Sequence, residues 1–78
     1  MARELVTEIL SEMVANVLAV SVATGDSVAV GDTVVLLESM KMEIPVIAEI
    51  AGLVRAVKVG PGDVVQEGSV LIEISPLA

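Results

Sequence analysis

Residues 17–37 read VLAVSVATGDSVAVGDTVVLL, and residues 54–74 read VRAVKVGPGDVVQEGSVLIEI. A shift of 37 positions lays the first stretch on the second. The two stretches then share a glycine–aspartate pair and a later glycine: Gly25, Asp26 and Gly31 in the first, Gly62, Asp63 and Gly68 in the second. Valines match easily in a valine-rich chain, whereas these three residues at fixed offsets do not. We interpret the chain as one structural unit written twice.

The shared glycines and aspartates predict turns. Residues 60–63, Gly-Pro-Gly-Asp, suit a type II turn, because proline presets φ at the second position and glycine takes a positive φ at the third. Gly25 takes the same role in the first half, and we interpret Asp26 and Asp63 as turn residues. A second turn or bulge in each half is expected at Gly31 and Gly68.

Valine-rich runs between these turns predict about four short strands in each half. In the first half we expect them at residues 5–10, 14–22, 27–30 and 34–39, with counterparts 37 positions later. Eight short strands indicate an all-β fold, a flattened eight-stranded β-barrel or sandwich with a quasi-twofold internal repeat. Valine and isoleucine are expected to fill its thin core.

The composition excludes several classes of protein. The 78 residues suffice for one domain, 1–78, and they include no Cys, His, Phe, Tyr or Trp. We therefore expect no metal site and no catalytic residues. A net charge of −7 argues against nucleic-acid binding. Short, interrupted apolar runs and an early acidic residue, Glu4, predict neither a membrane segment nor a signal peptide, and hence a cytoplasmic protein.

The two copies are joined by residues 38–43, Glu-Ser-Met-Lys-Met-Glu. Strands flank this segment, so a tight hairpin is expected to turn near Met40 and Lys41. Hairpin turns favour Asn-Gly or other glycine-containing pairs, and a departure from that rule tends to mark function. The shift of 37 maps Glu4 onto Lys41 and Lys41 onto Ala78. The repeat thus predicts Lys41 at one end of the domain, with the chain termini at the other.

The segment Ser-Met-Lys-Met resembles the biotinyl attachment motif of the biotin carboxyl carrier protein family, also known as the biotin-lipoyl attachment domain. The glycine–aspartate spacing on either side is also similar, so the resemblance covers nearly the whole chain, in a free-standing form that lacks the protruding thumb of some bacterial carriers. The resemblance implies covalent biotin on Lys41, with Met40 and Met42 recognised by the ligase. Catalytic residues are then expected to be none.

The function that the resemblance implies is that of a biotin carrier. Lys41 would be biotinylated by a biotin protein ligase and would shuttle carboxybiotin between the biotin carboxylase and carboxyltransferase subunits of a carboxylase. The chain would itself be a non-catalytic subunit. A lipoyl-type swinging-arm domain of an acyl-transfer complex is the alternative, although such domains typically carry Asp-Lys-Ala at the tip. Two further alternatives are less favoured: a structural module of this fold, which would lack the lysine, and an enzyme.

Plainer interpretations stay open for several residues. Met40 or Met42 could fill the core, since methionine adapts to irregular gaps. Glu38 and Glu43 could simply solvate the strand ends, and Arg55 and Lys58 are expected on a solvated strand face. The residue at the position of Gly52 in the first half is Ala15, which predicts a softer bend there. Met1 weakly favours a complete gene product over an excised domain.

Overall fold

The computed structural model describes residues 6–76, which form eight β-strands and no helix. The strands are β1 Thr7–Leu10, β2 Ala15–Val20, β3 Ser27–Val28, β4 Thr33–Ser39, β5 Met42–Ile47, β6 Gly52–Val57, β7 Val64–Val65 and β8 Val70–Pro76.

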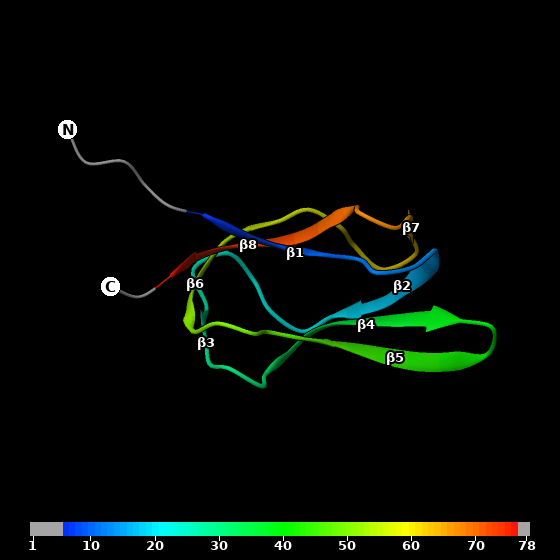
Figure 1. The fold of residues 1–78 in the computed structure, drawn as a ribbon, viewed down its shortest axis with the longest axis horizontal. Helices are drawn as coiled ribbons and strands as arrows, with labels where there is room; N and C mark the ends of the chain where they lie inside the picture. Colours follow the sequence, from blue (N-terminus) through cyan, green and yellow to red (C-terminus); the bar gives the residue numbers. More distant parts are fainter. Residues whose placement is uncertain (1–5, 77–78) are drawn as a thin grey trace.

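The strands build two four-stranded antiparallel sheets that face each other (Figure 1). One sheet has the order β1-β8-β6-β3, and the other has the order β5-β4-β2-β7. Each sheet therefore takes two strands from the first half of the chain and two from the second. This arrangement confirms the predicted all-β sandwich or flattened barrel.

The internal repeat is also confirmed. Strands β2, β3 and β4 recur as β6, β7 and β8 at a shift of 37 positions, and β5 contains the counterpart of β1. The same shift exchanges the two sheets strand for strand, since β1-β8-β6-β3 becomes β5-β4-β2-β7. The two halves are thus related by the quasi-twofold symmetry that the glycine–aspartate spacing predicts.

Two turns in each half have the geometry of type II turns, with a backbone hydrogen bond across the turn and glycine at a positive φ in third place. Gly25 and Gly62 have φ values of 95° and 93°, and the predicted turns at these positions are confirmed. Gly31 and Gly68, at 97° and 90°, occupy the second turn of each half.

Side chains cap all four turns. Ala23 N donates to Asp26 Oδ2 and Gly60 N donates to Asp63 Oδ2, each at 2.8 Å, which confirms both aspartates as turn residues. The sequence interpretation missed the other pair of caps. Asp32 Oδ2 accepts from Ala29 N at 2.8 Å, and the equivalent Ser69 Oγ accepts from Gln66 N at 3.0 Å.

These missed caps explain why the expected strand at 27–30 was too long. Asp32 N also donates to Ala29 O at 3.0 Å, so residues 29–32 form a turn and β3 ends at Val28. The expected strand at 14–22 is likewise shorter, Ala15–Val20, and the one at 34–39 begins a residue earlier, at Thr33. Of the expected strand at 5–10, Leu5 lies outside the described residues.

Hydrogen bonds between the halves interlock them. Gly25 N donates to Val54 O and Val54 N donates to Asp26 O, both at 2.8 Å, so a turn of the first half is tied to β6 of the second. The repeat produces the reciprocal pair: Gly62 N donates to Val17 O, and Val17 N donates to Asp63 O, again at 2.8 Å. Neither half completes its own hydrogen bonding alone.

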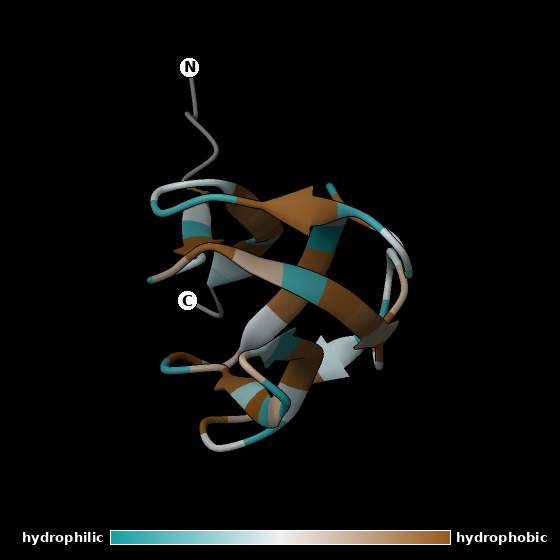
Figure 2. Ribbon diagram, turned by 90° about the vertical axis from the view of Figure 1, so that its right-hand side faces the viewer, coloured by the Kyte–Doolittle hydropathy of each residue, from teal (hydrophilic) through white to brown (hydrophobic). Residues whose placement is uncertain are grey.

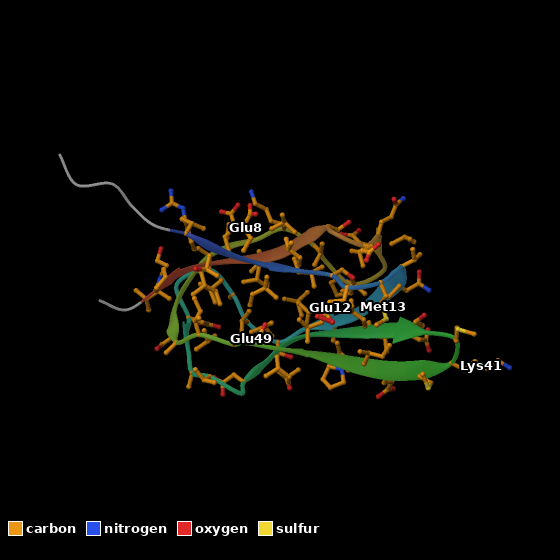
Figure 3. The ribbon with its side chains drawn as sticks, viewed as in Figure 1. Glu8, Glu12, Met13, Lys41 and Glu49 are labelled. Atoms are coloured by element: carbon orange, nitrogen blue, oxygen red, sulfur yellow. The ribbon has the colours of Figure 1, made fainter. Side chains whose placement is uncertain are left out.

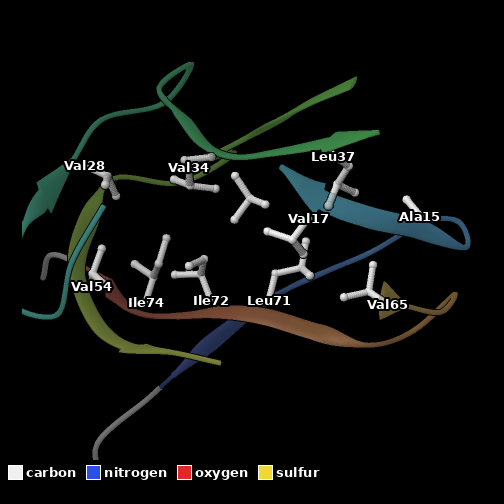
Figure 4. Close-up of a cluster of buried hydrophobic side chains, with 12 residues drawn as sticks. Ala15, Val17, Val28, Val34, Leu37, Val54, Val65, Leu71, Ile72 and Ile74 are labelled. Atoms are coloured by element: carbon white, nitrogen blue, oxygen red, sulfur yellow. The ribbon is translucent and has the colours of Figure 1, made fainter. Parts of the chain in front are cut away.

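The core lies between the two sheets and consists of aliphatic side chains (Figure 4). Figure 2 shows long apolar stretches along the strands, interrupted by single hydrophilic residues. Leucine joins the expected valine and isoleucine in the centre. The buried core residues are Ala15, Val17, Val28, Val34, Val35, Leu37, Ala48, Val54, Val65, Leu71, Ile72 and Ile74.

Gly52 is required by the close approach of β8. A Cβ atom placed on Gly52 would overlap the carbonyl oxygen of Ser75 and would lie 2.7 Å from Ile74 Cγ2. Gly52 has no positive φ, so contact with β8, rather than a sharper bend, distinguishes this position from Ala15 in the first half. Ala15 itself is buried in the core.

We predict that Gly52→Ala lowers the free energy of unfolding by about 1–3 kcal/mol, because β8 must shift to admit the methyl group. Gly60→Ala is the matched control, since a Cβ there meets no atom within 4 Å. The control should stay within about 0.5 kcal/mol of the wild type or become slightly more stable. Urea unfolding of both variants measures the difference, and equal midpoints would contradict it.

Candidate functional site at the Lys41 hairpin

Strands β4 and β5 form the hairpin that joins the two halves. Ser39 pairs with Met42 as the last register pair, so the loop consists of Met40 and Lys41 alone. Figure 1 shows this hairpin at the right-hand end of the molecule, whereas β1 begins and β8 ends toward the left. For the described residues this confirms the predicted separation of the tip from the chain ends. Glu4 and Ala78, which were expected at the far end, lie outside the described residues.

The backbone of the tip is strained. Met40 and Lys41 have φ values of 52° and 67°, and they are the described non-glycine residues with a positive φ. Positive φ at both loop residues is the geometry of a type I′ turn, whose twist matches the flanking strands. For residues with a Cβ atom this left-handed conformation costs roughly 1–2 kcal/mol each. Strain held at one exposed place indicates a functional constraint on the residue types there.

Lys41 extends away from the domain into solvent (Figure 3). Within residues 6–76 no ion pair or side-chain hydrogen bond is formed by its amine. Lys58, the residue after β6, differs in this respect, because its Nζ lies 3.8 Å from Glu73 Oε2 on β8. Arg55 on β6 is exposed, as expected for a solvated strand face, whereas Lys58 is exposed just beyond the end of that strand. Of the two lysine amines, that of Lys41 is therefore the one that projects freely into solvent.

The two flanking methionines are surface residues. Met40 is 90% exposed and Met42 is 61% exposed, so the possibility that one of them fills the core is wrong. The core is already closed at this end by Ala15, Val65 and Leu37. The hairpin tip thus exposes a primary amine between two thioether side chains, an apolar arrangement that solvation alone does not favour.

Two carboxylates lie behind the tip. Glu38 on β4 pairs directly with Glu43 on β5, one row from the Ser39–Met42 pair. Like charges in directly facing positions destabilise a sheet, so this pair adds to the unfavourable features of the hairpin. Glu43 is exposed and Glu38 is half-buried. The suggestion that they only solvate the strand ends stays a prediction.

A larger groove lies away from the tip, between the edge strands β1 and β5, and its lining includes Glu8, Glu12, Glu49 and Glu67. Figure 3 labels three of these glutamates. All four are exposed, and no three acidic side chains among the described residues are grouped so that they could hold a metal ion. The described part of the chain also contains no helix long and apolar enough to cross a membrane.

Comparison with known proteins places this geometry in a family. The family model Biotin_lipoyl, described as "Biotin-requiring enzyme", matches residues 6–74. The "Biotinylated protein TB7.3 homolog" of Mycobacterium leprae is 53% identical over 68 residues, which are 87% of this chain and 96% of that protein. The "Biotin/lipoyl attachment protein" of Bacillus subtilis is 48% identical over 64 residues, which are 82% of this chain and 88% of that protein.

Solved structures agree with the sequence relatives. A single-chain, multi-domain long-chain acyl-CoA carboxylase contains a region that superposes on 99% of this chain with a TM-score of 0.87 and 29% identity. The matching region is 8% of that chain. The family model, the sequence relatives and the fold agree on the class of domain. The chain belongs to the biotin/lipoyl attachment family.

We predict that replacing the tip by a favourable type I′ pair, Met40→Asn with Lys41→Gly, stabilises the domain by about 1–2 kcal/mol, because both residues then accept the positive φ. Lys41→Arg is the matched control, since it keeps the strained backbone and should leave stability within about 0.5 kcal/mol. Thermal unfolding measures both variants. If Asn-Gly failed to raise the melting temperature, the tip would not be strained.

Proposed function

We propose that this chain is a biotin carrier and that Lys41 holds biotin as an amide. One observation carries the proposal: on a strained two-residue turn at the end of an all-β domain, a solvated lysine amine is flanked in sequence by two exposed methionines. Support comes from the family and from relatives named as biotinylated or attachment proteins. Met40 and Met42 are proposed as the side chains that a ligase recognises.

The geometry suits the attachment reaction. The deprotonated Nζ of Lys41 attacks the carbonyl carbon of activated biotin, the activating group leaves, and the amine gives up its proton as the amide forms. A biotin protein ligase would supply activation and base, because no histidine or cysteine occurs in the chain. The domain itself contributes position: no described side chain competes for the amine, and the turn holds it clear of both sheets.

Once bound, biotin supplies a group that can carry a carboxyl between two active sites. Lysine and biotin together reach roughly 15 Å from the Cα, at about 1.25 Å per bond. Tethering raises the local concentration of the carried group to about the millimolar range. The proposed partners are a ligase and the biotin carboxylase and carboxyltransferase subunits of a carboxylase, with this chain as a non-catalytic subunit and residues 1–78 as one domain. Its cytoplasmic location stays a prediction.

A lipoyl group on Lys41 is the alternative, since the family and the Bacillus subtilis relative are named for both attachments. The exposed methionines favour biotin within this proposal, because an apolar pair beside the amine gives a ligase a recognition feature that a plain lysine lacks.

Co-expression with a biotin protein ligase should yield one biotinyl group per chain, and Lys41→Arg should abolish it. Lys58→Arg is the matched control and should be labelled like the wild type, because the Lys58 amine lies beside Glu73 and outside the hairpin. Intact-mass and peptide mass spectrometry measure the result. Biotin retained by Lys41→Arg, or a lipoyl mass on the wild type, would refute the proposal.

The position of the lysine should matter as well as its presence. Exchanging the loop residues, Met40→Lys with Lys41→Met, should abolish biotinylation, because neighbouring residues on the hairpin direct their side chains differently. Met40→Asp with Met42→Ala, keeping Lys41, should lower biotinylation and admit lipoylation. The intact mass of each variant is measured after co-expression with a biotin ligase and a lipoyl ligase. Full biotinylation of the exchanged variant would exclude a recognition role for the methionines.

A further inference from the structure

The quasi-twofold symmetry provides an internal reference for the surface around Lys41. A position that serves the fold alone should resemble its counterpart 37 residues away. Val14 and Val64 depart from this expectation, because their counterparts are Ala51 and Ser27, and so does Val30, whose counterpart is Glu67. Val14 and Val64 are 63% and 68% exposed, so the fold does not require their apolar side chains.

The most exposed of the large apolar side chains are concentrated at the Lys41 end of the molecule. Five large apolar residues in the described part of the chain are at least 61% exposed. Four of them lie near the hairpin tip: Val14, Met40, Met42 and Val64. The fifth, Val30, lies in the turn between β3 and β4. Highly exposed apolar side chains therefore cluster at the hairpin end of the molecule.

Val14, Met40 and Val64 border a shallow hollow beside the lysine, which Asn16, Glu38 and Lys41 also line. The sheet register explains their proximity: Asn16 on β2 pairs with Glu38 on β4 on one side and with Val64 on β7 on the other. Their neighbours in the next row, Ala15 and Val65, face the core. Because side chains alternate along a strand, Asn16 and Val64 lie on the outer face.

The length of the side chain on Lys41, with and without an attached group, indicates which partner contacts this surface. The unmodified lysine extends only about 6 Å from its Cα, so an enzyme that acts on its amine must contact the surface at its base. Partners that act later meet the end of an arm of roughly 15 Å and can stay clear of the hollow. Of the proposed partners, the attaching enzyme is thus the one that has to contact the surface at the base of Lys41.

We propose that Val14, Met40 and Val64 form the surface that the biotin-attaching ligase docks on while Lys41 reacts. This inference rests on the proposed function and extends it to two residues far from the motif in the sequence. The contacting surface of the ligase is apolar, and it covers the hollow on the side of the hairpin where Val14 and Val64 lie.

The test measures steady-state biotinylation of the full chain by a purified biotin protein ligase with ATP and biotin. The double variant Val14→Thr with Val64→Thr keeps the side-chain shape and adds hydroxyls. It should raise KM for the carrier about tenfold and leave kcat unchanged. Val30→Thr is the matched control: the wild-type residue is 67% exposed, and its variant should behave as the wild type. An unchanged KM, or a lower kcat at the same KM, would overturn the inference.

A second measurement needs no variant. Methyl NMR signals of the valines in the unmodified wild type should shift or broaden at Val14 and Val64 when ligase is added, and Val30 should stay unchanged. Undisturbed signals at both residues would overturn the inference even if the double variant did not fold. Failure of the proposed function has a separate signature, since the wild type would then acquire no biotin on Lys41.

Discussion

Backbone hydrogen bonds that pass between the two halves of the chain underlie the whole domain. A type II turn of each half is tied to a strand of the other, through Gly25 and Val54 on one side and Gly62 and Val17 on the other. Each sheet consequently contains strands from both halves. The same symmetry dictates where the site lies, because the segment that joins the halves has to leave one copy and enter the other at a single end of the molecule.

The hairpin at that end departs from the rest of the fold in three ways. Its two loop residues have positive φ without being glycine, two glutamates face each other behind it, and its methionines are exposed. A domain of this size buries only about 60–65% of its unfolded surface and has little stability to spare. Folding alone would select against these features, so their concentration around one solvated amine indicates a functional constraint at this end of the domain.

Local sequence predicted much of the fold. The glycine–aspartate pairs predicted the turns at Gly25 and Gly62, because a positive φ after a short strand is a local demand that glycine meets. The strand ends were less accurate at Val28, where the side chain of Asp32 closes a turn that valine-rich residues would otherwise continue as strand. Methionine gave no local signal of its location, because its apolar, flexible side chain suits a core as well as a surface.

The sequence by itself determined the repeat, the eight-stranded pattern and a tip centred on Lys41, since each follows from turn chemistry and alternation within a few residues. Only the tertiary structure decided which strands pair across the halves, and hence what lies close together. Gly52 is needed because β8 passes over it, a contact more than twenty residues away in the sequence. Val14 and Val64 lie beside Lys41 because β2 and β7 pair at the same end as the hairpin. Such proximity depends on long-range register, which no local pattern encodes.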